Sequence, residues 1–120
     1  KSFNRGRLDP VPMATGTRVG ATLAGDAAHA MPPFTGQGAV RALEDAVVLG
    51  RAVAAARDIP EALQRYEAAR HARTVQALAM SRSRANLYFG DDPGEQIKAL
   101  GAGMREIRGL YDYDAGTTPV

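Results

Sequence analysis

The residues best suited to chemistry lie in one short loop, GDAAHAMPPFTGQG, at positions 25–38. Gly25 allows the preceding segment to end tightly, and Asp26 presents a carboxylate that can accept hydrogen bonds from sugar-like hydroxyls. Gly36 and Gly38 have no side chains, so they leave the backbone N–H groups at a helix start accessible, and an anionic or electron-rich oxygen is favoured there. The loop therefore indicates a binding site for a ligand that carries hydroxyl groups and such an oxygen.

The elements on either side of this loop are predicted from the hydrophobic pattern. Residues 18–24, RVGATLA, form a short apolar run typical of a buried strand of about 5–6 residues. Residues 36–56 predict a helix packed on that strand. The residues expected on its inner side are Val40, Leu43, Val47, Val48 and Val53. Ligands of open α/β sheets bind beyond the carboxyl ends of the strands, which is where this loop would lie.

The second half of the chain is predicted to be helical. The sequence Asp58-Ile59-Pro60-Glu61 is typical of a helix start, and the helix would run to about residue 83 with Leu63, Tyr66 and Leu78 facing inward. A weaker helix is expected at residues 95–108, followed by a tail without periodicity. We therefore expect two parts, residues 1–57 and residues 58–120.

Composition narrows the class of protein. The chain of 120 residues is 45% hydrophobic and 23% charged, close to the average for globular proteins, and no apolar run approaches the roughly 18 residues of a membrane span. It has no cysteine, and its net charge of +2 comes from interspersed basic and acidic residues. These features argue against a disordered tail, a thiolate metal site and a nucleic-acid surface, and we expect a cytoplasmic protein without a metal.

The loop and the helix after it resemble a known family. GDAAHAMPPFTGQGAVRALEDAVVLGRAV resembles the second flavin motif of the class A flavoprotein monooxygenases, the single-component aromatic-ring hydroxylases of the para-hydroxybenzoate and salicylate hydroxylase types. A looser similarity covers Tyr66-Glu67 with Arg70 and Arg73, and LYDYD at positions 110–114 resembles the chain end of salicylate-hydroxylase-like members. The resemblance implies an α/β fold: the C-terminal fragment of a Rossmann-like FAD-binding domain, with one or two short strands followed by two or three helices.

The resemblance also implies roles for individual residues. Asp26 would bond the ribityl chain of FAD, the backbone from Gly36 to Ala39 would approach the pyrimidine edge of the flavin, and Pro33 and Phe34 would face the substrate. The implied cofactor-binding residues are Gly25, Asp26, Pro33, Gly36, Gln37, Gly38, Ala39 and Val40. Many members have Asn where this chain has Val40, so a side-chain hydrogen bond is lost there. No catalytic side chain is identified.

The implied activity is that of an FAD- and NAD(P)H-dependent monooxygenase, which hydroxylates an aromatic or polyketide-like small molecule through a flavin hydroperoxide. Because the GxGxxG strand-turn-helix that holds the ADP part of FAD is absent, we expect a fragment whose partners are a missing N-terminal half, a small aromatic substrate and O₂. Two alternatives stay open. One is a related flavoprotein reductase or halogenase, and the other is a non-catalytic helical fragment or interaction module.

Several polar residues are interpreted as structural. A single histidine in the loop, His29, favours a structural hydrogen bond over catalysis. Glu44 and Asp45 are neighbours on a helix and point about 100° apart, which argues against an acid/base pair. On the next helix we expect Tyr66 in the core and an ion pair between Glu67 and Arg70. The two tail tyrosines, Tyr111 and Tyr113, are expected to pack the tail more than to touch a substrate.

Overall fold

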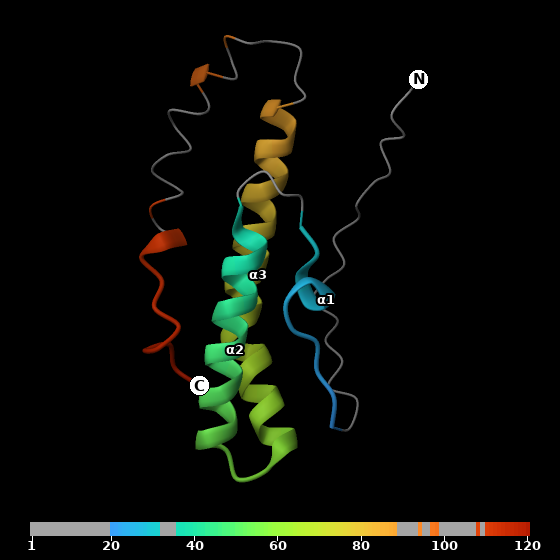
Figure 1. Ribbon diagram of the computed structural model, residues 1–120, viewed down its shortest axis with the longest axis vertical. Helices are drawn as coiled ribbons and strands as arrows, with labels where there is room; N and C mark the ends of the chain where they lie inside the picture. The colour runs from blue at the N-terminus through green and yellow to red at the C-terminus, as the bar shows by residue number, and fades with distance from the viewer. Residues whose placement is uncertain (1–19, 32–35, 89–93, 95–96, 99–107, 109) are drawn as a thin grey trace.

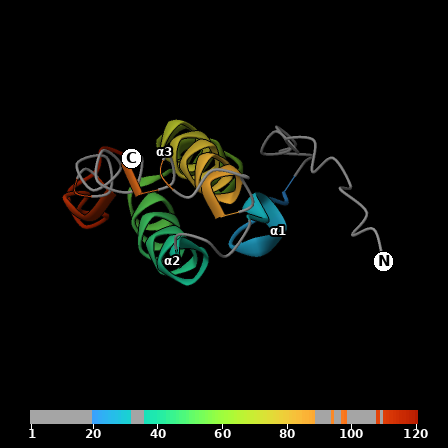
Figure 2. The ribbon, with the colours of Figure 1, turned by 90° about the horizontal axis from the view of Figure 1, so that it is seen from above.

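The computed structural model describes residues 20–31, 36–88, 94, 97–98, 108 and 110–120. Its elements within these residues are three helices: α1 (Asp26–His29), α2 (Gln37–Ala55) and α3 (Ile59–Tyr88). Figure 1 shows α2 and α3 side by side and antiparallel, joined by a tight turn. Seen from above in Figure 2, α1 lies on one side of this pair and the C-terminal segment, residues 110–120, on the other.

The turn between α2 and α3 follows from its residues. The Oδ1 atom of Asp58 accepts a hydrogen bond of 2.8 Å from the N–H of Glu61, which caps the first turn of α3. Pro60 lies in this first turn, where its missing N–H costs no helical hydrogen bond. The helix start predicted at residues 58–61 is therefore confirmed, and α2 covers the predicted helix at residues 36–56 to within one residue at each end.

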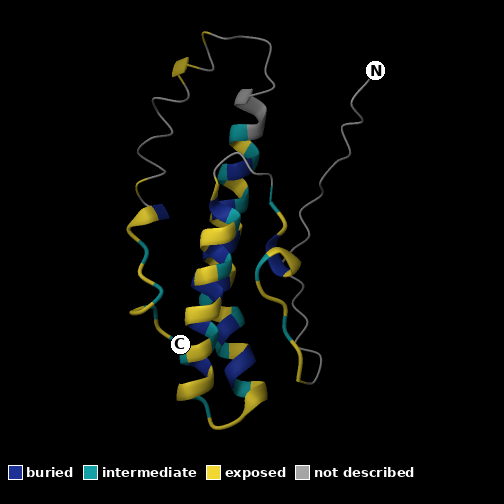
Figure 3. Ribbon diagram, viewed as in Figure 1, coloured by how far each residue is buried: buried dark blue, intermediate teal, exposed yellow. Residues whose placement is uncertain are grey.

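A small apolar core joins the two helices near this turn. Val48 and Ala52 of α2 pack with Tyr66 of α3, and all three are fully buried. Ala115 and Val120 of the C-terminal segment pack against them. Arg51 fixes the segment there, because its Nη1 donates to the carbonyls of Ala115 (2.8 Å) and Thr118 (2.6 Å). Figure 3 shows the buried faces of α2 and α3 turned toward each other.

The predicted α/β class is wrong for the described part of the chain, which is helical and contains no strand. A strand is held by a ladder of hydrogen bonds to a neighbouring strand, whereas among residues 20–24 only Ala21 takes part in an isolated bridge and side chains of α3 hold the next two residues. Thr22 donates to Glu67 (2.7 Å), and the hydroxyl of Tyr66 donates to the carbonyl of Leu23 (3.2 Å). In the described residues 20–24, the expected Rossmann-like strand is therefore replaced by an irregular segment against α3, and the loop after it begins with the single turn of α1.

The predicted inner face of α2 is also largely wrong. Of the five residues expected there, only Val48 is buried; Val40, Leu43, Val47 and Val53 are 37% to 70% exposed. The buried residues of α2 are Gln37, Arg41, Glu44, Asp45, Val48 and Ala52. Its first half thus turns charge, not apolar surface, toward α3.

On α3 the prediction of the inner face is better. Leu63 and Tyr66 are buried and Leu78 is partly buried. Most of the helix predicted at residues 95–108 lies outside the described residues. Among the described helices, none has a stretch sufficiently long and apolar to cross a membrane.

Candidate functional site

The loop between residues 25 and 38 begins with a glycine that sets its direction. Gly25 has φ of +58°, a conformation that other residues rarely adopt, and its carbonyl accepts hydrogen bonds from Ala28 (2.9 Å) and His29 (3.0 Å). The chain therefore turns sharply into α1. The side chain of Asp26, the first residue of α1, is exposed.

The carboxylate of Asp26 lies beside the bare first turn of α2. A Cβ atom added at Gly38 would lie 3.7 Å from Asp26 Oδ1. The helix begins after Gly36, which has φ of +63°, and no side chain caps it. A Cβ atom added at Gly36 would meet nothing within 4 Å among the described residues. The site thus pairs an exposed acceptor with a helix N-terminus whose N-cap residue, Gly36, makes no side-chain hydrogen bond, and such an N-terminus favours an anion.

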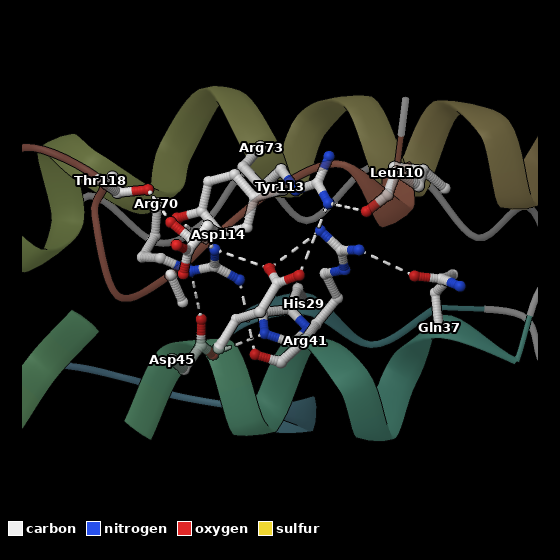
Figure 4. A network of polar contacts seen from close by, with 12 residues as sticks. His29, Gln37, Arg41, Asp45, Arg70, Arg73, Leu110, Tyr113, Asp114 and Thr118 are labelled. Carbon is white, nitrogen blue, oxygen red and sulfur yellow. Dashed lines mark hydrogen bonds and ion pairs between the residues drawn. The ribbon is translucent and has the colours of Figure 1, made fainter. Parts of the chain in front are cut away.

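Beneath this exposed layer, the carboxylate of Asp45 holds the loop to the helix pair. Its Oδ2 accepts the N–H of Gly25 and the Nε2–H of His29, each at 2.7 Å, and its Oδ1 accepts Nε–H of Arg70 at 2.7 Å. The side chains of Asp45 and His29 are each 1% exposed. Figure 4 shows these groups converging between α2 and α3.

The neighbouring carboxylate, that of Glu44, forms ion pairs with three arginines. Its oxygens lie 2.9 Å from Arg41, 2.8 Å from Arg70 and 3.5 Å from Arg73. The ring of Tyr113 covers the last two, with guanidinium-to-centroid distances of 5.4 and 4.4 Å. We call this group the charge cluster; its members are His29, Arg41, Glu44, Asp45, Arg70, Arg73 and Tyr113.

The hydrogen bonds of the charge cluster decide the protonation of Asp45. Burial alone would raise its pKa, but the hydrogen bonds from His29, from the N–H of Gly25 and from Arg70 outweigh burial and hold the pKa at about 2. Asp45 is therefore an anion at neutral pH. Burial would lower the pKa of Arg70, but its bonds to Asp45 and Tyr113 raise it overall, so this guanidinium is a fixed cation.

The structure brings most of the predicted site residues together around α1 and the start of α2. Ala39 and Val40 are exposed, whereas Gln37 is buried and its amide donates to Tyr111 (3.4 Å) and accepts from Arg41 (2.8 Å). The side chain of Gln37 therefore points along α2 and toward the C-terminal segment. Pro33 and Phe34, predicted to face the substrate, lie outside the described residues.

The polar residues interpreted as structural are found in structural contacts, with one correction. His29, Glu44 and Asp45 are buried and bonded to protein atoms, and Tyr113 packs over arginines. We expected Arg70 to pair with Glu67 on its own helix, but it reaches Glu44 and Asp45 of α2 instead. The reason is burial: a fully buried guanidinium needs buried carboxylates, and Glu67 is only partly buried.

Arg41 and Arg73 also belong to this cluster, although neither was predicted from the sequence to do so. A signal was present. Positions 41, 44 and 45 fall on one face of a helix, and positions 70 and 73 fall on one face of the next. Opposite charges on facing sides of an antiparallel pair indicate an internal ion network.

Comparison with known proteins identifies the kind of domain. Residues 12–81 match the family described as an FAD binding domain. The chain is 40% identical over 84 residues to the FAD-dependent urate hydroxylase of Klebsiella pneumoniae, covering 70% of this chain and 22% of that protein. It is 41% identical over 81 residues to 3-hydroxybenzoate 6-hydroxylase 1 of Aquipseudomonas alcaligenes, covering 68% and 20%.

A solved structure agrees with these sequence relatives. The crystal structure of Klebsiella pneumoniae HpxO complexed with FAD and uric acid superimposes with a TM-score of 0.62 and 38% identity, covering 76% of this chain and 25% of that one. The chain therefore belongs to the FAD-binding domain family of the class A flavoprotein hydroxylases, and FAD is its cofactor. It spans 22% of the urate hydroxylase and 20% of the hydroxybenzoate hydroxylase.

The low pKa of Asp45 predicts a loss of stability in acid. Its folded pKa of about 2 lies below the ordinary value of 3.8, so the ionised form stabilises the fold above about pH 4 and this contribution is lost as pH falls toward 2. We expect roughly 2 kcal/mol of the unfolding free energy to disappear over this range. Urea denaturation between pH 7 and pH 2 measures it.

The matched variants are Asp45→Asn and Asp58→Asn. Asp45→Asn should lower the unfolding free energy at pH 7 and flatten its dependence below pH 4. Asp58→Asn keeps a capping side chain at an exposed position and should change neither. An Asp45→Asn protein that retains the full acid dependence would show that other carboxylates cause it.

Proposed function

We propose that the chain is part of an FAD- and NAD(P)H-dependent monooxygenase that hydroxylates a small aromatic or polyketide-like molecule. The observation that carries the proposal is the exposed carboxylate of Asp26 beside the uncapped first turn of α2. The Asp26 carboxylate can accept hydrogen bonds from hydroxyl groups, and the backbone N–H groups of the first turn of α2 can donate to an electron-rich oxygen. FAD has both hydroxyl groups and electron-rich oxygens. The names of the relatives, hydroxylases of urate and of 3-hydroxybenzoate, support an aromatic substrate.

Each part of the loop has a role in this proposal. Asp26 accepts hydrogen bonds from the ribityl hydroxyls, and Gly25 gives the turn that presents it. The backbone of α2 from Gly36 through Gln37, Gly38, Ala39 and Val40 approaches the pyrimidine edge of the flavin. The positive end of the α2 dipole stabilises negative charge on the reduced ring. FAD, when bound, supplies the redox and oxygen-transfer chemistry, which for this family means NAD(P)H oxidation and a flavin hydroperoxide.

The remaining parts of the site complete the proposal. Pro33 and Phe34 form the substrate side of the loop. Other parts of a longer polypeptide hold the ADP portion of FAD, and O₂ is the co-substrate. Residues 1–57 then belong to the FAD-binding domain and residues 58–120 to a helical region that supports it.

The first test removes the carboxylate. In the full-length protein, Asp26→Ala should weaken FAD binding about ten- to a hundredfold, because one hydrogen bond to a charged group is lost, while the fold is retained. Fluorescence titration of apoprotein with FAD measures the Kd. Asp58→Asn removes the charge of another exposed carboxylate, at the turn between α2 and α3, and should leave the Kd unchanged. Equal Kd values for the wild type and Asp26→Ala would remove Asp26 from the site.

The second test restricts the backbone at the start of α2. Because Gly36 has φ of +63° and open space beside it, Gly36→Val strains the helix start and fills that space, so FAD should be lost on dialysis. Gly50→Val makes the same change within α2, also into open space but at a residue of ordinary helical φ, and should retain FAD. The absorbance ratio of bound flavin to protein is the measurement. Full flavin content in Gly36→Val would contradict the proposed contact.

The third test separates a hydroxylase from a reductase or a plain flavin binder. Phe34→Ala should keep FAD but loosen the substrate, so that more NAD(P)H is oxidised to hydrogen peroxide without product. The ratio of hydroxylated product to NAD(P)H consumed should fall, and the apparent KM for the substrate should rise. If both stay at the wild-type values, the loop holds flavin only and the substrate side lies elsewhere.

A further inference from the structure

The C-terminal segment is linked to the loop at Gly25 through a continuous line of hydrogen bonds that are partly or fully buried. Arg70 Nη1 donates to the hydroxyl of Tyr113 (3.1 Å), and Arg70 Nε donates to Asp45 Oδ1 (2.7 Å). The other oxygen of Asp45 accepts the N–H of Gly25 (2.7 Å), the residue before Asp26. Residues far apart in the sequence are thus joined by three bonds between Tyr113 and the residue that presents the Asp26 carboxylate.

Asp45 is the residue in this line that sets the loop against α2. It belongs to α2, whose N-terminus forms one side of the proposed flavin site, and it bonds Gly25 and His29 at the two ends of the short turn that carries the other side. Since Oδ2 takes both of these bonds, a shift of the carboxylate moves the whole turn. The distance between Asp26 and the first turn of α2 therefore depends on where the Asp45 carboxylate is held.

The C-terminal segment contributes to holding the Asp45 carboxylate in place, through its contacts with Arg70. Arg70 is fully buried, and its remaining donors are directed to Glu44, to the carbonyl of Arg41 and to Tyr113. The Tyr113 ring also lies over Arg70 and Arg73, and Arg73 donates to the carbonyl of Leu110. A second contact of the same segment, from Gln37 to the Tyr111 hydroxyl, reaches the start of α2 itself. The segment thus contacts the α2 side of the proposed site directly and is linked to the Asp26 side through Arg70 and Asp45.

Helix packing alone does not require this arrangement. Apolar residues of similar volume join two helices as well as buried ions do or better, since the ions must be desolvated. A carboxylate can instead bond a backbone N–H and a guanidinium in fixed directions at once. That property is needed where a loop must be placed accurately.

We infer that Asp45 is a positioning residue of the flavin site, and that the C-terminal segment fixes it through Tyr113 and Arg70; this rests on the proposed function. Residues 110–120 then belong functionally to the cofactor site, although they lie on the opposite side of the helix pair from α1 (Figure 2). Neither Asp45 nor Tyr113 is assigned contact with the flavin itself.

The test compares Tyr113→Phe with a stability control in the full-length protein. Tyr113→Phe removes the hydroxyl that Arg70 contacts and keeps the ring over both arginines. We expect the Kd for FAD to rise about three- to tenfold, less than for loss of a direct contact. The visible absorbance and circular dichroism bands of the bound flavin, recorded at saturating FAD, should also shift.

The control is Leu63→Ala, a cavity variant in the first turns of α3 next to the α2–α3 turn. It should lower Tm at least as much as Tyr113→Phe, while the Kd for FAD and the flavin bands stay at their wild-type values. Asp45→Asn, if it folds, should exceed Tyr113→Phe in both flavin readouts. Should it not fold, Tyr113→Phe and its control decide the matter alone.

The outcomes separate this inference from the proposed function. A Tyr113→Phe protein with lower Tm but unchanged Kd and flavin bands would overturn the positioning role, even while Asp26→Ala loses FAD as proposed. The same would hold if Leu63→Ala changed the flavin bands equally. A wild-type full-length protein that binds no FAD would remove the proposed function, and the inference with it.

Discussion

The carboxylate of Asp45 is the constraint on which the described structure depends. Its two oxygens bond the loop before α2 at Gly25 and His29, and α3 at Arg70. A buried charge is tolerated only if each of its lone pairs is matched by a donor, so the loop, α2 and α3 have few relative positions open to them. The two parts of the proposed flavin site, at Gly25–Asp26 and at the start of α2, are thereby held together.

The two long helices could be predicted from the sequence because their signals are local. Asp58 and Pro60 mark a helix start, and the run of alanine, leucine and glutamate before them favours a helix. The strand at residues 18–24 could not be judged in this way. Whether such a run pairs with a strand depends on partners elsewhere in the fold, and here Tyr66 and Glu67 supply side-chain partners from more than 40 residues away.

The inner face of α2 shows a different limit. An apolar pattern predicts burial only when the facing surface is also apolar, and α3 presents Arg70 and Arg73 to the first half of α2. At the site, glycine at positions 25 and 36 could be predicted to adopt special backbone angles, and both have positive φ. The hydrogen bond between His29 and Asp45 could not be predicted from the sequence, because no local pattern connects two residues that are 16 positions apart, one in a loop and one in a helix.

The internal ions also constrain how this sequence can diverge. Replacing any one of Glu44, Asp45 or Arg70 removes a partner from a buried network of ions, and breaking a buried ion pair costs about 3–5 kcal/mol. Substitutions of a single member of the charge cluster are therefore selected against, whereas the simultaneous substitution of several members can be neutral. Descendants of this domain should inherit the cluster as a block or replace it as a block, and α2, α3 and the C-terminal segment should vary in concert.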